Sequence, residues 1–467
     1  GDKPDVANKE RDAIMAFETR LAKVTLTNVE RRDPEKVYHR VEKAGLQKIA
    51  PSFDWDQFYS AMGAPKDPAL SVEHIPFFQE FDKIVKDTTP DTWEAYLSWV
   101  YLRSIVPALP KAFQDEAFAY SSKALTGAKE DRPRWKKCVS FADEQLGEAL
   151  GRVFVDETFG ADGKARTLAI VKALEGSMAD DLKAVPWMDA ATKKTALEKA
   201  AKMYNKIGYP DKWRDYSSYK TQGHVFLTNW LNGNAFEAKR DLDKIGKPVD
   251  KGEWQMTPPT VNAYNDPQLN QIVFPAGILQ PPFFNKDATD AVNFGAMGMV
   301  VGHESTHGFD DEGRKFDQDG NLRDWWSKDA ATKFEAKTKC VVEQFNGYPS
   351  IDAGAPEVKL KGDLTLGENT ADLGGLKISL AAMHTWIKQH PLAPSAYSPE
   401  QQYFLGYAQS WCSKFRPENA RLRAATDPHS PPYWRVNGPL SNMPEFAAAF
   451  GCKASDKMVR KDRCEVW

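Results

Sequence analysis

The chain has 467 residues, a length at which one hydrophobic core usually divides, so two lobes are expected. Its composition of 42% apolar and 27% charged residues is that of an ordinary globular protein and excludes a disordered or fibrous one. The net charge of -3 leaves no basic excess to neutralise phosphates, so nucleic acid is not an expected partner. No apolar run reaches the roughly 18 residues that a membrane span needs.

Predicted helices dominate the first part of the chain. Apolar residues recur at three- and four-residue spacing in the ranges 92–108, 140–159, 165–182 and 189–207. Capping residues such as Asp189 precede several of these ranges. We therefore expect residues 1–225 to form an all-α lobe, incomplete on its N-terminal side.

The pattern changes after about residue 225. Prolines punctuate a connection, and a strand-like run at 271–274 follows a turn at 265–267. Helices are then predicted at 287–308, 327–345, 362–390 and 399–415. Residues 226–467 are therefore expected to form a second lobe, mainly α with a small amount of strand.

The strongest chemical signal is the run His303-Glu304-Ser305-Thr306-His307. Histidines four residues apart project from one face of a helix, so both imidazoles can reach a single Zn²⁺. Glu304 is rotated towards the open side of such a metal, where a general base is needed. Two hydrogen-bonded core histidines are the alternative interpretation.

A catalytic zinc usually takes three protein ligands, so a third residue is required. The metzincin pattern has its third histidine six residues after the second, where this chain has Gly313. Glu368 and Asp372 stand four apart on a predicted helix face that is otherwise apolar, and buried paired carboxylates need a cation. A solvated helix face is the alternative. We expect one Zn²⁺ per chain, held by His303, His307 and Glu368.

The other acidic residues near the motif have expected roles of their own. Glu304 would take a proton from the zinc-bound water and pass it to the leaving amine. Asp310 and Asp372 are the acidic residues best placed to accept the second N–H of the two metal-binding histidines.

Five cysteines, none in a pair spaced for structural zinc, leave the redox compartment open. They are Cys138, Cys340, Cys412, Cys452 and Cys464. Buried free thiols of a cytosolic protein are one interpretation. Disulfide bonds in an oxidising compartment are the other.

Several blocks of the sequence, in the same order, resemble signatures of the neprilysin and endothelin-converting-enzyme family of zinc metallopeptidases. The resemblance covers roughly residues 90–467, and it departs from the family at Asn265, where a second aromatic residue is common. The blocks are 261–264, 272–284, 302–311, 367–376 and 464–467.

The resemblance implies a mainly α, two-lobed zincin fold, with a thermolysin-like catalytic lobe and an all-α lobe enclosing a central chamber. It implies the zinc ligands, the base and the two orienting aspartates that were predicted above from residue spacing. It also implies that His429 faces the transition state and that Arg435 grips a substrate carbonyl. Without the resemblance, a histidine in a Pro-rich loop is usually structural or solvated, and this is the alternative interpretation of His429.

Substrate-binding residues also follow only from the resemblance. Asn262 and Ala263 would hydrogen-bond the substrate backbone from an edge strand, although Asn262 is alternatively a turn residue. A pocket for large hydrophobic side chains is implied by residues that otherwise read as ordinary core: Ile278, Phe283, Met299, Val300 and Trp411.

The resemblance further implies a Cys340–Cys464 disulfide and bonds from Cys138, Cys412 and Cys452 to an upstream segment of the same protein. The suspected disulfides, with no Asn-x-Ser/Thr acceptor in the chain, favour a bacterial periplasmic or secreted location. The expected function is hydrolysis of oligopeptides on the amino side of large hydrophobic residues. A catalytically silent peptide-binding protein on the same fold and a zinc aminopeptidase are the alternatives.

Overall fold

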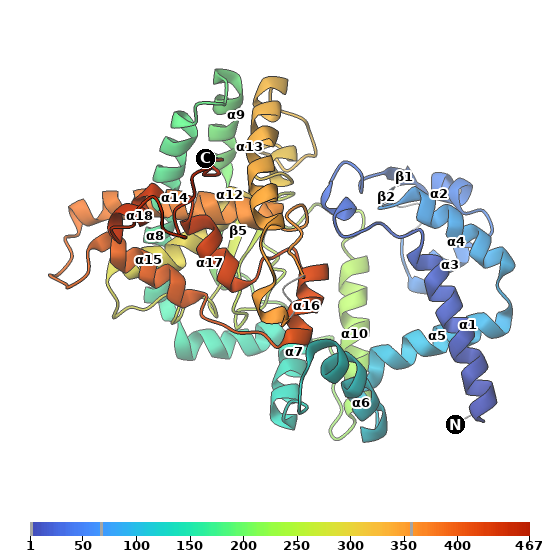
Figure 1. The fold of residues 1–467 in the computed structure, drawn as a ribbon. Coiled ribbons are helices and arrows are strands. Elements are labelled where there is room, and N and C mark those ends of the chain that lie inside the picture. The colour runs from blue at the N-terminus through green and yellow to red at the C-terminus, as the bar shows by residue number, and fades with distance from the viewer. Residues whose placement is uncertain (1–2, 66–68, 355–357) are drawn as a thin grey trace. The chain divides into compact units, whose positions relative to one another are not determined.

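A computed structural model describes residues 3–65, 69–354 and 358–467. The chain folds into two compact units, each built from two stretches of sequence. Helices predominate in both units, which confirms the predicted mainly α class (Figure 1). The first unit comprises Gly1–Ser121 and Asp215–Asp250; the second comprises Ser122–Arg214 and Lys251–Trp467.

These units do not coincide with the lobes expected at 1–225 and 226–467. Residues Ser122–Arg214 belong with the C-terminal part of the chain. The reason is that α8 (Gly160–Ala184) packs against α14 (Leu366–Gln389), the helix that carries Glu368. The division into a lid lobe at 1–225 and a catalytic lobe at 226–467 stays a prediction.

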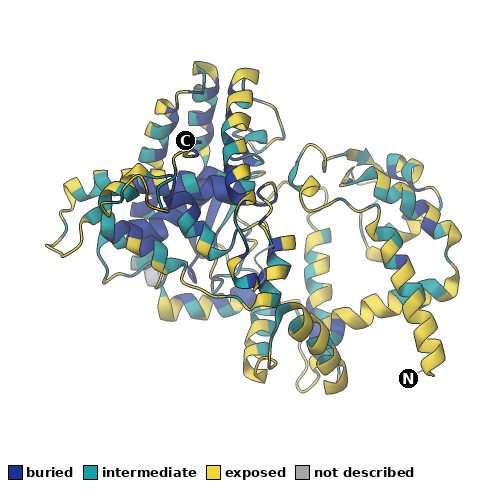
Figure 2. Ribbon diagram, in the orientation of Figure 1, coloured by how far each residue is buried: buried dark blue, intermediate teal, exposed yellow. Residues whose placement is uncertain are grey.

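The first unit is largely helical around a small core. Its antiparallel strands β1 (Arg40–Glu42) and β2 (Ala69–Ser71) correct the expectation of an all-α N-terminal lobe. They cover a cluster centred on Trp55, and most other residues of this unit are exposed or half-buried (Figure 2). The helices of this unit are α1 (Pro4–Ala22), α2 (Lys43–Ile49), α3 (Trp55–Met62), α4 (Ile75–Asp87), α5 (Pro90–Ile105), α6 (Lys111–Ala117) and α10 (Phe226–Leu242), with 3-10 turns η1 (Glu30–Arg32) and η2 (Val106–Ala108).

The second unit holds most of the buried side chains, which surround α12 (Met299–His307), α14 and β5 (Gln271–Pro275) (Figure 2). A π-helical segment, η3 (Phe118–Ala124), joins the two units in sequence. The other helices of this unit are α7 (Arg134–Thr158), α9 (Ala190–Lys202), α11 (Asp290–Asn293), α13 (Lys328–Asn346), α15 (Pro399–Ser410), α16 (Pro417–Thr426), α17 (Pro432–Leu440) and α18 (Pro444–Ala449), with short turns η5 (Gly313–Lys315) and η6 (Ile351–Ala353).

A three-stranded sheet with strand order β3-β5-β4 lies beside α12. The central strand β5 is buried along its whole length and confirms the strand predicted at 271–274. β3 (Tyr204–Gly208) pairs with it in parallel, so the helix predicted at 189–207 is wrong at its end. Helix α9 stops at Lys202 because the next residues hydrogen-bond to β5 instead of continuing the helix.

The helix predicted at 287–308 is interrupted. It consists of α11, a π-helical segment η4 (Phe294–Gly298) and α12. At Gly295 a β-carbon would lie 1.9 Å from the carbonyl oxygen of Tyr403, so α15 approaches η4 too closely for any other residue. Single-turn π segments are frequent beside functional sites.

The C-terminal tail is tied to the second unit by a disulfide between Cys340 and Cys464, which confirms the pairing that the family resemblance implied. Indole N–H donors add to this attachment: Trp187 donates to the carbonyl oxygen of Val466 at 2.8 Å, and Trp467 donates to that of Thr370 at 3.4 Å. The disulfides expected to an upstream segment stay a prediction.

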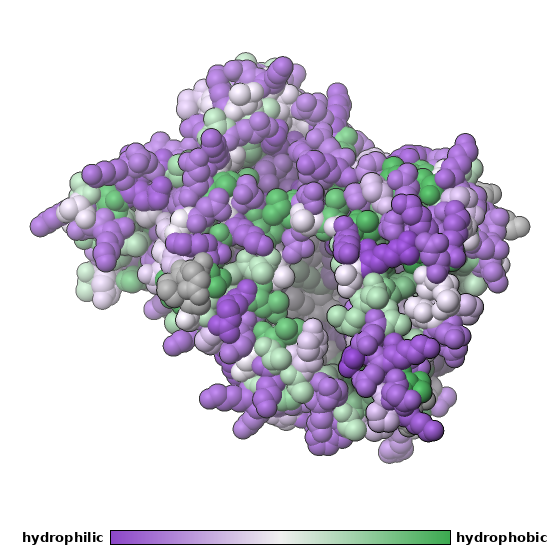
Figure 3. Space-filling view, turned by 45° about the vertical axis from the view of Figure 1, so that its right-hand side comes forward, coloured by the Kyte–Doolittle hydropathy of each residue, from purple (hydrophilic) through white to green (hydrophobic). Residues whose placement is uncertain are grey.

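The surface is mixed in character. On the face drawn in Figure 3, hydrophilic side chains predominate and hydrophobic ones form separate smaller areas. Among the described residues, no helix combines the length and the apolar character needed to cross a membrane.

Candidate active site

The two histidines of α12 point at each other. Nε2 of His303 and Nε2 of His307 lie 3.0 Å apart, one helical turn along the same face. His303 is buried and His307 is half-buried, so neither ring is freely solvated. Two ring nitrogens so close in a protein interior need a proton or a cation between them.

Glu368 brings a carboxylate from α14 to the same point. Its Oε2 lies 3.2 Å from Nε2 of His303, and its Oε1 lies 3.6 Å from Nε2 of His307. The three ligand atoms all lie within 4.8 Å of one another, in the group that the sequence predicted. Two imidazoles and a carboxylate form a donor set that suits Zn²⁺, so the residues present fit the metal.

A carboxylate oxygen lies within hydrogen-bond distance of Nδ1 of each histidine. Asp372 Oδ1 lies 2.9 Å from Nδ1 of His303, and Asp310 Oδ2 lies 2.6 Å from Nδ1 of His307. An Nδ1–H that donates to a carboxylate leaves Nε2 with its lone pair for a metal. The two aspartates therefore stand where the sequence predicted, and their geometry suits the orienting role.

The charges of this cluster shift its pKa values strongly. Burial by itself lowers the pKa of His307, but attraction to Glu368 and the hydrogen bond to Asp310 outweigh it and raise that pKa to about 10. Burial favours the neutral form of Glu368, yet attraction to His307 holds its pKa well below the ordinary value. The site therefore favours positive charge at its centre, which also favours a bound cation.

Glu304 lies between the two histidines in sequence and is buried beside the cluster. Burial raises the pKa of its carboxyl group above the ordinary value, and the neighbouring His303 opposes that shift. A carboxylate whose pKa is raised towards neutrality is suited to accept a proton.

His429 and Arg435 reach the cluster from the end of the chain. Nε2 of His429 lies 3.3 Å from Glu368, and its Nδ1 lies 2.9 Å from Asp427. Arg435 is buried and binds Asp372 through two nitrogens at 2.6 and 2.9 Å. Its guanidinium also lies 4.2 Å from the ring centre of Trp411. Both residues are thus near the candidate metal centre, whereas their contacts with a substrate stay predictions.

The segment expected to bind a peptide backbone lies just outside the strand assigned to it. Asn262 and Ala263 precede β4 (Tyr264–Asp266), which begins one residue later where Tyr264 pairs with Val273. Strand β4 is an edge strand of its sheet, as expected. Asn262 is exposed and Ala263 is buried, so only the first presents its side chain to solvent.

The residues expected to form a specificity pocket share one hydrophobic cluster with the metal helix. Ile278, Met299 and Val300 are buried in it, and Phe283 and Trp411 pack against it. Their contact with a substrate side chain stays a prediction.

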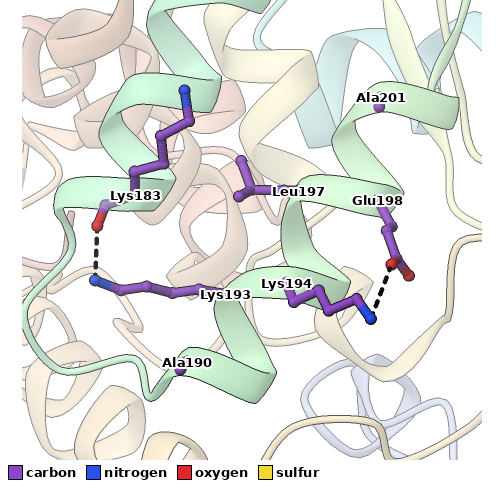
Figure 4. Close-up of a pocket in the computed structure, with 7 residues that line it drawn as sticks. All are labelled: Lys183, Ala190, Lys193, Lys194, Leu197, Glu198 and Ala201. Atoms are coloured by element: carbon purple, nitrogen blue, oxygen red, sulfur yellow. Dashed lines mark hydrogen bonds and ion pairs between the residues drawn. The ribbon is translucent and has the colours of Figure 1, made fainter.

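A separate open depression of about 560 Å³ lies between the end of α8 and α9, and no residue of the cluster lines it (Figure 4). It is lined by Lys183, Ala190, Lys193, Lys194, Leu197, Glu198 and Ala201. Lys193 donates to the carbonyl oxygen of Lys183 at 2.7 Å, and Lys194 lies 4.0 Å from Glu198. These charges are already paired on an exposed helix, so we assign no chemistry to the depression.

Comparison with known proteins agrees with this geometry. Two models described as peptidase family M13 match residues 1–210 and 262–466. The crystal structure of the zinc metalloprotease Zmp1 of Mycobacterium tuberculosis with an inhibitor has 37% sequence identity and a TM-score of 0.95, over 100% of this chain and 72% of that one. The chain belongs to peptidase family M13. PepO from Lactobacillus rhamnosis has 30% identity and a TM-score of 0.88, over 99% of this M13 chain and 71% of its own.

Human endothelin-converting enzyme 1 is 37% identical to the M13 chain over 482 residues, which cover 100% of this chain and 62% of that protein. The chain from Locusta migratoria named endothelin-converting enzyme homolog is also 37% identical, over 97% of this chain and 65% of its own length. The M13 chain thus spans less than two thirds of the length of these curated relatives.

Two residues that support the site were not predicted. Lys199, fully buried on α9, donates to the carbonyl oxygens of Gly308, Gly313 and Phe316 at 2.6–2.8 Å. Asn265 donates to the carbonyl oxygen of Glu304 at 2.9 Å. No local pattern marks Lys199, while Asn265 was visible only as a departure from the family signature.

Proposed function

We propose that this chain carries the catalytic site of a zinc-dependent endopeptidase that hydrolyses oligopeptides on the amino side of large hydrophobic residues. The observation that supports it most is the convergence of two imidazole nitrogens 3.0 Å apart with the Glu368 carboxylate, directly beside the buried Glu304. Membership of peptidase family M13 supports zinc as the metal, one ion per chain.

Within this proposal, His303, His307 and Glu368 hold the metal, and Asp310 and Asp372 keep both imidazoles in the required tautomer. When bound, Zn²⁺ would polarise the scissile carbonyl as a Lewis acid and lower the pKa of the attacking water. Glu304 takes a proton from the attacking water on its carboxylate as the new C–O bond forms. It then gives that proton to the leaving amine as the C–N bond breaks.

His429 and Arg435 have electrostatic roles in this proposal. Both carry N–H donors within a few ångströms of the cluster, at 3.3 Å from Glu368 for His429 and 3.4 Å for Arg435. Fixed donors stabilise developing negative charge without reorganisation, and most strongly where water is excluded. Arg435 is buried, whereas His429 is exposed and would be covered only by a bound substrate. His429 would face the oxyanion, while Arg435 would orient Asp372 and bind a substrate carbonyl.

Substrate recognition would use the sheet edge and the core cluster beside the metal helix. Asn262 and Ala263 precede the edge strand β4, so an extended peptide would be able to add along this side. The preference for a large hydrophobic side chain would come from Ile278, Phe283, Met299, Val300 and Trp411.

We also propose an extracytoplasmic location and an upstream segment of the same protein. The Cys340–Cys464 disulfide supports an oxidising compartment, periplasmic or extracellular. Cys138 and Cys412 are exposed and Cys452 is half-buried, so each would be able to bond to such a segment.

The test is hydrolysis of a fluorogenic, end-blocked peptide with Phe or Leu after the scissile bond, with a chelator and with Zn²⁺ re-added. Cleavage before the hydrophobic residue that is lost with chelator and restored by zinc supports the proposal. Zinc-loaded protein that binds the peptide without cleaving it would instead identify a peptide-binding protein. Cleavage only of the free-amine version of the peptide would identify an aminopeptidase.

A further inference from the structure

The last turn of α12 receives one of its hydrogen bonds from a neighbouring strand. The helix ends at His307, so a candidate ligand lies in its last turn. The last four carbonyl groups of a helix lack partners within the helix. The N–H of Gly308 turns back to Ser305, and that of Phe309 turns back to Thr306. The carbonyl oxygen of Glu304 takes its hydrogen bond from outside, from the side chain of Asn265.

Asn265 is the middle residue of β4, where it pairs with Ile272 of β5. Its side chain reaches across to α12 with Nδ2 2.9 Å from the Glu304 carbonyl oxygen. The donor must be the amide NH₂ group, because a carbonyl oxygen can only accept. One short side chain therefore joins the edge strand to the peptide group of the residue proposed as the base.

The segment that precedes this strand, 262–263, is the part proposed to bind the substrate backbone. A lengthening of the Asn265 contact would move that segment relative to Glu304. The imidazole rings of His303 and His307 are held separately, by Asp372 and Asp310 respectively. The position of a bound substrate relative to Glu304 and the orientation of the two histidine ligands thus depend on different contacts.

We propose that Asn265 is a positioning residue that fixes the peptide-binding edge relative to the catalytic base; this inference rests on the proposed function. It acts on the alignment of the scissile bond and leaves the metal site unchanged. Small errors of alignment reduce the rate of a bound substrate more than its binding, so the effect falls on kcat.

The matched control is Asn205. It pairs with the same Ile272 from the opposite side, on β3, and its side chain donates to Glu175 at 2.6 Å. The Asn205→Ala variant removes an asparagine hydrogen bond from the same row of the sheet without touching α12. The Asn265→Ala variant removes the proposed tether, and Asn265→Gln retains an amide donor.

For zinc-loaded protein, we expect Asn265→Ala to lower kcat by about 5- to 20-fold with little change in KM, and Asn265→Gln to recover part of it. The zinc dissociation constant should stay within about 2-fold of the wild-type value. Hydrogen exchange should become faster in the peptide covering 261–266 in Asn265→Ala and stay unchanged there in Asn205→Ala.

Equal kcat values for Asn265→Ala and Asn205→Ala would overturn the inference. A loss of zinc affinity in Asn265→Ala that accounts for its lower kcat would overturn it as well. Wild-type protein that binds zinc but does not cleave would overturn the proposed function instead. In that case the exchange measurement still decides whether Asn265 tethers the edge strand.

Discussion

Gly302 on α12 and Gly375 on α14 meet where the two helices of the candidate metal centre cross. A β-carbon on Gly302 would lie 2.8 Å from the carbonyl oxygen of Gly375, and one on Gly375 would lie 2.7 Å from the backbone nitrogen of His303. The neighbouring atoms belong to the backbone, so they cannot move aside as a flexible side chain would. Because neither glycine carries a side chain, α14 approaches α12 closely enough for Glu368 to reach the two histidines.

The first prediction concerns this crossing. In Gly375→Ala, the added methyl group should push α14 away from α12 and weaken zinc binding by at least about 10-fold, since ligand geometry controls the affinity. Competition with a chromogenic chelator measures it. Gly176→Ala on α8 is the control, because its β-carbon would meet no atom within 4 Å. That variant should keep full zinc affinity and gain about 0.4–1 kcal/mol in unfolding free energy. Unchanged affinity in Gly375→Ala would contradict the explanation.

The second prediction concerns the proposed base. Glu304→Gln should retain zinc, because all three ligands remain, while kcat falls by about 10²- to 10⁴-fold. Metal analysis and hydrolysis of the blocked peptide should be run on the same preparation. A variant that lost its metal yet kept activity would overturn the assignment.

The third prediction concerns the orientation of His307. In Asp310→Asn, a neutral amide replaces the carboxylate 2.6 Å from Nδ1, so zinc affinity should fall by about 10- to 100-fold. Asp319→Asn alters an exposed carboxylate that pairs with Lys202 and should leave the affinity unchanged. Equal affinities in the two variants would show that the charge on Asp310 does not matter.

The sequence predicted the metal group well because helical spacing carries most of the information. The four-residue spacing of His303 and His307 places both on one helix face, and an apolar helix face around Glu368 indicates a buried carboxylate. Strand β3 was missed because its pairing partner begins more than 60 residues later, at Gln271, and the local pattern continued the helix. Lys199 was missed for the same reason, since its three acceptors lie 109, 114 and 117 residues away.

The fourth prediction concerns the pH dependence of stability. Burial lowers the pKa of Lys199 to about 7 from 10.5, although Asp310 and Asp317 favour the charged form. Between these two values the unfolded chain binds more protons than the folded one, so the unfolding free energy should rise with pH. Below about pH 7 this contribution should be flat.

Urea unfolding of metal-free protein from pH 7 to pH 9.5 measures the slope. Lys199→Met should show a smaller rise than the wild type, and it should be less stable at each pH because three buried carbonyl groups lose their donor. Identical slopes would show that Lys199 does not titrate in this range.

The fifth prediction concerns the disulfide. The bond closes a sequence separation of 124 residues, so replacing Cys340 and Cys464 by serine should cost about 2–5 kcal/mol of unfolding free energy. Cys138→Ser removes an exposed free thiol and should leave the stability unchanged. An unaltered urea midpoint in the double variant would mean that the indole contacts of the tail suffice.

The contacts of the C-terminal tail with α14 affect where another protein can be fused to the chain. The last residue of the sequence, Trp467, donates its indole N–H to the carbonyl oxygen of Thr370, and its ring lies near Gly374, six residues beyond the candidate ligand Glu368 on α14. An affinity tag or fused fluorescent protein at this end would begin beside the helix that supplies a metal ligand.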